Sequence, residues 1–351
     1  MRRPSLVMLV LGCAGFLLAG CDCEGPSGRL PEFTKSDSAV EAARKAPPMP
    51  AGPPRPRIGV IPMTIKTGFW RGVRTGVVNA TQELKGIRTT WEGPANGVGA
   101  QTQAAIIASF VENKASGIIV APVDAEALLP SVQAARKAGI PVLALLSELG
   151  DPEACIGLVA TDNAKVGELG ATRLAEVLGP KGGKVVLLRG VEHDPVSEAR
   201  EKAFLDTIAK RSGVEVVSSD QHAGKTVDTA ASTALTILNK FRPGQVNGVF
   251  CSNEAGSTGM LRELKETNRL ATVRMVGVNC NDQLAEEVMV GNIDGLVLEN
   301  TLELGSTAVK VMVAHLRGEP APKQTLVPPV LATQDLLPDV TLYMLMHPPK
   351  E

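Results

Sequence analysis

Histidine, aromatic residues and net charge are all scarce in this sequence. The 351 residues include four His, one Tyr, two Trp and seven Phe, and the formal net charge is −1. A charge so close to zero gives no global field that favours nucleic acid or an acidic surface. The histidines show no metal-ligand spacing such as HExxH. We therefore expect neither a nucleic-acid partner nor a metal site.

Motifs that carry catalysis or bind a cofactor are missing as well. Residues 179–184 have the glycines and lysine of a phosphate loop, but the spacing is wrong and no Ser or Thr follows the last lysine. The run Gly256-Ser257-Thr258-Gly259 lacks the pattern of a nucleophile elbow. We therefore expect a protein that is not an enzyme and that uses no cofactor.

Long apolar runs are absent except at the start of the chain. Five residues, two of them Arg, precede an apolar stretch over residues 6–20, which is shorter than the roughly 20 residues that span a bilayer. A basic start, an apolar run and then small residues are the layout of a secretory signal. The letters LAGC ending at Cys21 match the bacterial lipobox, whose cysteine becomes the lipidated first residue of the mature protein. We predict a signal peptide at 1–20 and a lipid anchor on Cys21, with an uncleaved anchor as the alternative.

The segment after this signal has little that a core could bury. Residues 21–56 contain eight prolines and few apolar side chains, a composition typical of an unfolded tether. The tether would allow a folded part to dock on a membrane partner while it stays anchored beside it. We expect that folded part outside the cytoplasm, on the periplasmic side of the inner membrane or on the outer cell surface.

The cysteines past the anchor show no pairing pattern. Cys23, Cys155, Cys251 and Cys280 remain, and none of them forms a CxxC motif. A disulfide is permitted outside the cytoplasm, although sequence alone cannot pair the four thiols. We expect buried free thiols.

From residue 57 onward the chain alternates between strands and helices. Apolar runs predict strands at 57–62, 117–122, 140–145, 184–188, 214–217, 248–251, 273–278 and 295–298. Helical spacing and stop signals predict helices at 69–84, 125–138, 197–210, 228–239, 258–267 and 304–316. Such alternation implies right-handed βαβ units and mostly parallel sheets. We predict an α/β fold with two doubly wound parallel sheets, whose ligand site lies at the carboxyl ends of the strands.

Residues at those strand ends resemble a known family. The landmarks are Lys66-Thr67-Gly68-Phe69-Trp70, Ala121-Pro122-Val123-Asp124, Ala160-Thr161-Asp162-Asn163, residues 194–200, Cys251-Ser252-Asn253-Glu254 and Val276-Gly277-Val278-Asn279. In this order the chain resembles the periplasmic sugar-binding proteins of the ribose- and galactose-binding type over nearly all of residues 57–335. The resemblance implies two lobes joined by three crossings, with the ligand enclosed between them.

The resemblance also implies lobe boundaries and a partner. The N-terminal lobe would comprise residues 57–160 and 301–329. The C-terminal lobe would comprise residues 161–300 and a final strand near 330–345. The protein would capture a small molecule, of which a monosaccharide is the leading candidate, and deliver it to the membrane permease of an ABC importer.

A sugar presents apolar C–H faces and a rim of hydroxyls, so its site needs an aromatic ring and planar polar groups. Phe69 and Trp70 match the family's stacking position, and Thr67 precedes them in the same landmark. Both aromatics could instead be core residues of the first helix. Because adjacent helical positions point about 100° apart, we expect at least one of them to face the ligand.

Three polar residues match family ligand contacts. Asp124 corresponds to a carboxylate of the first lobe, with a helix N-cap as the alternative role. Arg200 corresponds to an arginine whose guanidinium donates to hydroxyls or to the ring oxygen; an exposed helical arginine is the alternative. Asn253 corresponds to an asparagine that both donates and accepts.

Two further site positions depart from the ribose-binding pattern. Asn279 stands where that pattern has Asp, and Glu299 stands where it has Gln. The aromatic expected near Ala223 is also missing. We infer that Glu299 faces a hydroxyl or amine donor and that these departures speak against ribose as the ligand; another sugar, a signalling furanose, a nucleoside or a polyol stays open.

Related architectures leave one alternative function open. Regulators of the lactose-repressor type share the architecture, but they would need a helix-turn-helix where this chain has a signal and a tether. A sensor that is read by a chemoreceptor or a histidine kinase would have the same ligand site as an importer subunit. In every version we expect closure of the lobes about the crossings when ligand binds.

Overall fold

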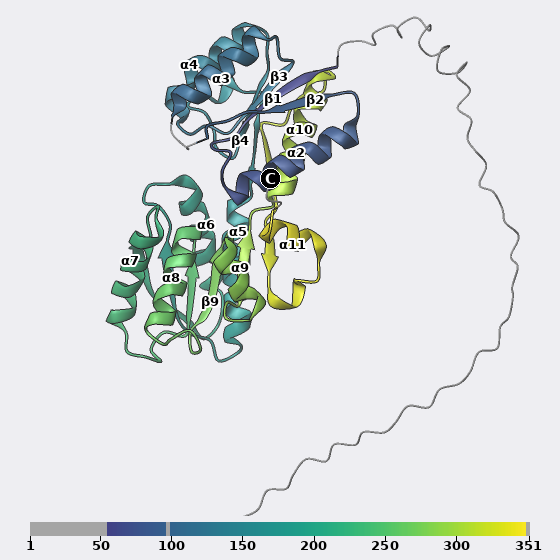
Figure 1. The fold of residues 1–351 in the computed structure, drawn as a ribbon. Coiled ribbons are helices and arrows are strands. Elements are labelled where there is room, and N and C mark those ends of the chain that lie inside the picture. The colour runs from purple at the N-terminus through teal and green to yellow at the C-terminus, as the bar shows by residue number, and fades with distance from the viewer. Residues whose placement is uncertain (1–54, 96–98, 349–351) are drawn as a thin grey trace, which may run out of the picture. The chain divides into compact units, whose positions relative to one another are not determined.

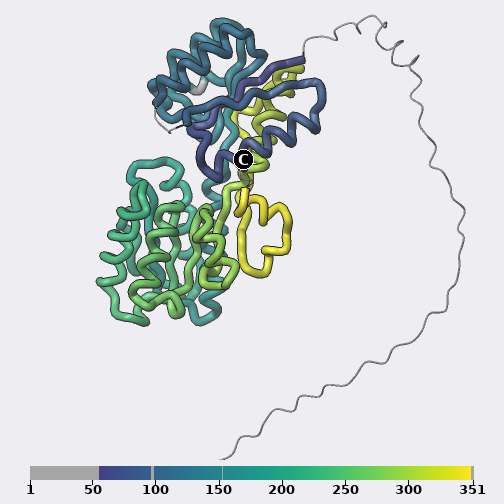
Figure 2. The backbone as a smooth tube through the Cα atoms, viewed as in Figure 1, coloured from purple at the N-terminus to yellow at the C-terminus, as the bar shows by residue number. Residues whose placement is uncertain are grey.

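The computed structural model describes residues 55–95 and 99–348. The predicted signal peptide, Cys21, Cys23 and nearly all of the predicted tether lie outside these residues. The described chain forms two sheets of six strands each, and Figures 1 and 2 show each sheet with helices on both of its faces.

The first sheet is entirely parallel. Its strand order is β11-β5-β4-β3-β1-β2. The strands are β1 (Arg57–Ile61), β2 (Arg88–Trp91), β3 (Gly117–Val120), β4 (Val142–Leu145), β5 (Leu158–Thr161) and β11 (Gln324–Val327). Its helices are α2 (Gly68–Leu84), α3 (Ala100–Glu112), α4 (Ala125–Lys137) and α10 (Thr301–Leu316). We call this unit the N-terminal lobe.

Alternating strand residues distribute these helices between two faces. Ile58 and Val60 of β1 belong to the cluster with α2 and α10, whereas Ile61 belongs to the cluster with α3 and α4. The central strands β3 and β4 are buried along their whole length, as expected for parallel strands covered on both sides. This is why their sequences are continuous apolar runs rather than alternating ones.

The second sheet has the order β12-β10-β9-β8-β6-β7. Its strands are β6 (Gly183–Arg189), β7 (Val214–His222), β8 (Gly248–Cys251), β9 (Arg274–Val278), β10 (Gly295–Leu298) and β12 (Val330–Ala332). Its helices are α5 (Asn163–Leu178), α6 (Pro195–Ile208), α7 (Val227–Lys240), α8 (Glu254–Glu266), α9 (Asp282–Met289) and α11 (Val340–Met346). All neighbours are parallel except β12, which is antiparallel to β10. We call this unit the C-terminal lobe.

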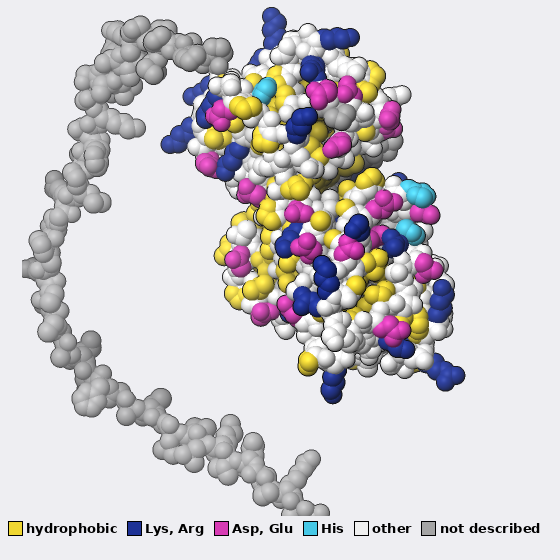
Figure 3. All heavy atoms as spheres, turned by 180° about the vertical axis from the view of Figure 1, so that it is seen from behind, with side chains coloured by type: hydrophobic (Ala, Val, Ile, Leu, Met, Phe, Trp, Pro, Cys, Tyr) yellow, Lys and Arg dark blue, Asp and Glu magenta, His cyan; other side chains and the backbone are white. Residues whose placement is uncertain are grey.

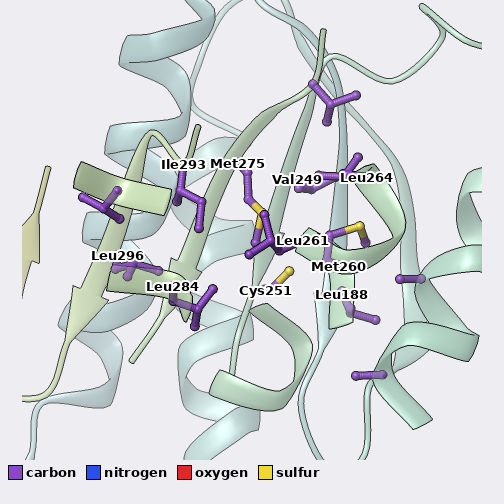
Figure 4. Close-up of a cluster of buried hydrophobic side chains, with 14 of the residues drawn as sticks. Leu188, Val249, Cys251, Met260, Leu261, Leu264, Met275, Leu284, Ile293 and Leu296 are labelled. Carbon is purple, nitrogen blue, oxygen red and sulfur yellow. The ribbon is translucent and has the colours of Figure 1, made fainter. Parts of the chain in front are cut away.

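Helices α5 and α6 cover one face of this second sheet, and α7, α8, α9 and α11 cover the other. Figure 4 shows the core on the second face, where side chains of β8 and β9 meet those of α8 and α9. Cys251 lies inside this core, and Cys155, Cys251 and Cys280 are all free thiols. The expectation of buried free thiols is therefore confirmed for Cys251, whereas Cys155 and Cys280 are free but only half-buried.

The chain crosses between the two sheets after β5, after β10 and after β11. The predicted fold class, two α/β lobes with mostly parallel sheets, is confirmed. The expected final strand near 330–345 is shorter than predicted, because strand structure ends at Ala332 and a short 3₁₀ turn and α11 follow. The reason is local: Asp339 caps α11 by accepting from the Leu342 amide at 2.8 Å, and apolar residues then recur at helical spacing.

The face of the molecule in Figure 3 carries no dominant charge over the described residues. On the face shown in Figure 3, acidic and basic side chains are interspersed with apolar ones over the described part of the chain. Among the described residues, no helix combines the length and the apolar character needed to cross a membrane. Two short 3₁₀ helices, Pro152–Ala154 and Gln334–Leu336, complete the secondary structure.

Candidate functional site

The helices that follow the strands begin at polar residues at the carboxyl ends of both sheets. Asp124 accepts from the Ala127 amide at 3.0 Å and caps α4. Asn253 accepts from the Gly256 amide at 2.7 Å and caps α8. Thr67 precedes α2 without a side-chain cap bond, so its hydroxyl is not used by the helix. Short polar residues at these positions thus start the helices and also bring polar atoms to the edge where parallel sheets bind ligands.

A buried carboxylate, Glu299, lies at the centre of this edge. It directly follows β10, at the second crossing between lobes. One of its oxygens, Oε1, accepts from Arg200 Nη2 at 2.7 Å and from Asn279 Nδ2 at 3.1 Å. The other, Oε2, accepts from Thr161 Oγ1 at 2.7 Å. Three segments far apart in the sequence therefore meet on a single carboxylate.

Arg200 holds this cluster on the side of the C-terminal lobe. Its side chain is 5% exposed and that of Glu299 is 10% exposed, so the ion pair is almost fully removed from water. Arg200 Nε donates to Asn163 Oδ1 at 2.8 Å, and Nη1 lies 3.4 Å from the Ser252 carbonyl oxygen. All three nitrogens of the guanidinium thus have an acceptor. Because the group is planar and rigid, these contacts fix both its position and its orientation.

The charge state of Glu299 follows from two opposed effects. Burial raises the pKa of this carboxyl, but the charge of Arg200 and the hydrogen bonds from Thr161, Asn279 and Arg200 outweigh burial, so the pKa lies below its usual range. Glu299 is therefore ionised at neutral pH and acts only as an acceptor. The site can thus accept hydrogen bonds from hydroxyl or amine groups of a ligand.

Asn279 has an unusual backbone conformation at this point. It lies directly after β9 with a positive φ of 61°, in the left-handed region that Asn tolerates better than most residues. Its side chain donates to Glu299, and its Oδ1 lies 3.4 Å from the backbone nitrogen of Glu299. Asn279 and Glu299, the two positions at which the sequence departs from the expected pattern, are therefore hydrogen-bond partners.

A cavity of about 550 Å³ opens beside this cluster, a size within the usual range for small-ligand sites. Four of the predicted site residues line it: Thr67, Phe69, Asn279 and Glu299. The cavity is also lined by Gly68, Arg71, Glu254, Cys280, Asn281, Asp282, Gln283, Leu298, Thr301, Leu345, Met346 and Pro348. It therefore combines residues of both lobes with residues of the second crossing.

The two adjacent aromatics take different positions. Trp70 is 4% exposed and packs in the core of the N-terminal lobe, where its ring lies 6.4 Å from that of Trp91. Phe69 is partly buried and lines the cavity, with its ring edge-on to Trp70 at 5.2 Å. Phe69 is thus the aromatic that is available to a ligand, and Trp70 supports it from behind.

Four predicted site residues do not line this cavity: Trp70 and Arg200, whose positions are described above, and Asp124 and Asn253. Asp124 serves as the α4 cap described above. The Asn253 side chain caps α8 and donates from Nδ2 to the Gly224 carbonyl at 3.1 Å. Both side chains are therefore committed to backbone partners here.

Several residues of the site were not singled out from the sequence. Thr161 and Asn163 belonged to a recognised landmark, yet they were not chosen as site residues. Glu254 belonged to another recognised landmark and was not chosen either. Asn281 follows β9 and could have been found from the rule that ligands bind after parallel strands. Leu345 and Pro348 had no such signal, because they follow no strand of a βα unit.

A larger cavity, of about 670 Å³, lies at the opposite end of the N-terminal sheet. It is lined by residues that begin β4, such as Val142, and by residues near the end of α10, such as Gly318. It contains none of the predicted site residues. Since ligands of parallel sheets bind at the carboxyl ends of strands, we assign the ligand site to the smaller cavity.

Comparison with known proteins gives matches over most of the chain. The family model for the periplasmic binding protein domain matches residues 58–320. The D-allose-binding periplasmic protein of Escherichia coli (strain K12) is 26% identical over 323 residues, which cover 88% of this chain and 97% of the relative. The xylitol-binding protein of Mycolicibacterium smegmatis is 32% identical over 234 residues, which cover 66% of this chain and 65% of the relative.

A solved structure gives a match of the same extent. The ABC transporter periplasmic solute binding protein of Actinobacillus succinogenes 130z, solved with bound D-allose, superposes with a TM-score of 0.70 at 22% identity, over 80% of this chain and 98% of that one. At this identity the likeness shows the fold, which agrees with the two α/β lobes described above.

Proposed function

The chain belongs to the periplasmic binding protein family, as its sequence predicts, and we propose that it captures a sugar or sugar-like ligand between its lobes and delivers it to an ABC importer. The observation that carries this proposal is the cavity beside Glu299, where an aromatic ring from one lobe and a fixed acceptor at the crossing face the same space. No catalytic role is proposed for any residue.

Each group on the cavity has a role that suits a polyhydroxylated ligand. The Phe69 ring can stack on a C–H face of the ligand. Glu299 can accept from a ligand hydroxyl, and the Asn279 amide and the Thr67 hydroxyl can each donate or accept. We propose Arg200 as the residue that keeps Glu299 charged and oriented. Trp70, Asp124 and Asn253 are proposed to hold the loops of the site.

The proposed mechanism is closure of the lobes about the crossings. The Thr161–Glu299 hydrogen bond joins the end of β5, at the first crossing, to the residue after β10, at the second. A ligand that touches Phe69 on one side and Asn279 on the other gains all of its contacts only when the lobes are closed. Its greater affinity for the closed state shifts the population toward that state.

Export, anchoring and lobe boundaries complete the proposal. We propose that Cys21 carries the lipid, that residues 21–56 form the tether, and that the protein acts outside the cytoplasm beside a membrane permease. We also propose residues 57–160 with 301–329 and residues 161–300 with 330–345 as the two lobes. Metabolic labelling with a fatty acid, lost in Cys21→Ala, tests the anchor.

A thermal-shift screen tests the ligand class. The probe set is pentoses, hexoses including D-allose, polyols including xylitol, and nucleosides, added to protein expressed without residues 1–20 and with Cys21→Ala. A ligand at 100 times its Kd stabilises the fold by about 2.7 kcal/mol. We expect a sugar to give such a shift and Phe69→Ala and Glu299→Gln to reduce it. A blank screen on well-folded protein would remove sugars, polyols and nucleosides as the ligand class.

A polyol is the second candidate ligand. The xylitol-binding relative is 32% identical over the matched region, more than the D-allose-binding one. A linear polyol has no flat ring face, so it depends less on stacking than a pyranose does. Loss of binding in Phe69→Ala that is large for D-allose and small for xylitol would separate the two modes of recognition.

A further inference from the structure

The C-terminal segment after β12 is held in the C-terminal lobe. Helix α11 places Leu342, Leu345 and Met346, which are 3%, 9% and 2% exposed, in the same core as α9 and β10. Figures 1 and 2 show this segment, in yellow, beside α9 and the C-terminal lobe. The position of the segment is therefore set by burial of its apolar face.

The end of this segment lies on the proposed ligand cavity. Leu345, Met346 and Pro348 line the cavity that Phe69 and Glu299 also line. We call these three C-terminal residues the C-terminal wall. They supply apolar surface to a cavity whose other lining residues include several acidic and amide side chains, so one side of the site differs in character from the rest.

The wall also reaches the ligand loop of the N-terminal lobe. Gly68 is the first residue of α2, between Thr67 and Phe69. A Cβ atom built on Gly68 would lie 3.3 Å from Pro348 Cγ, which is tighter than an ordinary contact, and 3.5 Å from Arg71 Nη2, which is an ordinary one. The missing side chain at Gly68 thus lets Pro348 approach the loop that carries Phe69.

We propose that the C-terminal wall is a specificity element of the ligand site, a role that rests on the proposed function. The side chains of the wall cannot hydrogen-bond like a hydroxyl or an amide; they line the cavity, and Pro348 lies next to Gly68. A ligand hydroxyl or substituent directed there either meets Pro348 sterically or loses its hydrogen bonds to water without a replacement. Such a desolvated polar group is costly, so the wall selects ligands that are small or apolar on that side.

Three variants of the mature protein test this proposal. A chain that ends at His347 lacks Pro348 but keeps Leu342, Leu345 and Met346, the residues that anchor α11. Pro348→Ala removes only ring atoms from the full chain. Val340→Ala is the matched control, because Val340 lies on α11 with Leu345 and Met346, is 71% exposed and does not line the cavity.

The measurement is the Kd of each protein for D-allose and for xylitol by titration calorimetry, together with its melting temperature without ligand. We expect the chain ending at His347 to bind the preferred probe about tenfold more weakly and to discriminate less between the probes, since lost apolar contact in a pocket costs about this much. We expect Pro348→Ala to change in the same direction by about threefold and the control to match the parent. Melting temperatures should be unchanged.

Failure of the inference and failure of the proposed function give different results. If the parent binds a probe and both variants bind both probes with the parent's affinities, the inference is wrong and the function stands. If the shortened chain no longer shows a folded transition, the Kd values of Pro348→Ala are compared with those of the parent instead, and equal values show that the inference is wrong. A parent that binds neither probe nor any member of the screening set overturns the proposed function, and the C-terminal wall has no ligand to select.

Discussion

Replacement of Glu299 by Gln should weaken the fold far more than an ordinary surface substitution. The change keeps the size of the side chain and removes its charge. Arg200, whose side chain is 5% exposed, would then be a buried cation without a counter-charge. Loss of one partner of a buried ion pair costs about 3–5 kcal/mol. Because a Gln oxygen can still accept one hydrogen bond, we expect Glu299→Gln to lower the free energy of unfolding by about 3 kcal/mol at pH 7.

The pH dependence gives the effect a second signature. The pKa of Glu299 is lowered in the fold, from an ordinary value of 4.5. A carboxyl with a depressed folded pKa contributes stability that is present above the unfolded value and is lost as the pH falls through the folded value. The difference in stability between parent and Glu299→Gln should therefore be constant above about pH 5 and shrink as the pH falls below 4.5.

The assay is urea unfolding followed by circular dichroism between pH 3.5 and pH 8. Glu176→Gln is the matched control, since Glu176 is 58% exposed and forms a surface pair with Arg173 at 3.6 Å, which should contribute at most about 1 kcal/mol. A second variant, Arg200→Met combined with Glu299→Gln, should recover part of the loss because no unpaired charge remains. A Glu299→Gln protein as stable as the control at pH 7 would refute the reasoning.

Three further outcomes follow from the same structure. Burial raises the pKa of Glu254 above its usual 4.5, so the protonated carboxyl costs the fold nothing below that pH, whereas its ionised form destabilises the fold as the pH rises. Glu254→Gln should therefore raise the melting temperature at pH 7 but not at pH 4. An equal rise at both pH values would contradict this. Burial raises the pKa of the Cys280 thiol to about 12 and also raises that of the Cys251 thiol. Both thiols should therefore react slowly with a disulfide reagent at pH 8, and bound ligand should slow the reaction of Cys280 further. Reaction at the rate of the unfolded protein would be inconsistent with the fold. A Cβ on Gly76 would lie 2.0 Å from the Leu302 carbonyl oxygen, so an alanine there would push α2 away from α10. Gly76→Ala should therefore lower the urea midpoint of unfolding by an amount equivalent to about 1–3 kcal/mol. An unchanged midpoint would show that the helices separate without cost.

Most of the fold could be predicted because its signals are local. The buried strands β3, β8 and β10 are continuous apolar runs, and their positions match the predicted strands. The strands β2, β5 and β11 and the helices α3, α5, α9 and α11 were not predicted, and β2 and α5 illustrate two different reasons. Strand β2 is an edge strand with the sequence Arg-Thr-Thr-Trp and no buried residue, so it has no apolar run.

Helix α5 was missed because glycines weaken its helical signal. Those glycines have a tertiary purpose. A Cβ on Gly167 would lie 2.0 Å from the Arg200 carbonyl oxygen, and one on Gly170 would lie 2.3 Å from the Phe250 ring. Close packing of α5 on α6 and on β8 therefore requires residues that lower the intrinsic helix propensity of α5.

The candidate site was predictable in part. The rule that ligands bind after parallel strands, together with the family resemblance, pointed to Phe69, Asn279 and Glu299. The rule could not decide which strand-end side chain faces the cavity, because a capping bond and a ligand contact favour the same residue types at the same positions. Asp124 shows this: its carboxylate caps α4, a role that favours the same residue at the same position as a ligand contact does.

The sequence by itself predicted an export signal, and it determined the alternation of strands and helices, the two sheets and the edge at which a ligand should bind, because each depends on neighbouring residues or on short-range periodicity. Only the tertiary structure decided which distant residues meet. Thr161 and Glu299 are 138 positions apart and share a hydrogen bond of 2.7 Å, and Pro348 approaches Gly68 from the far end of the chain. Such contacts follow from sheet order and helix packing, which no local pattern in the sequence encodes.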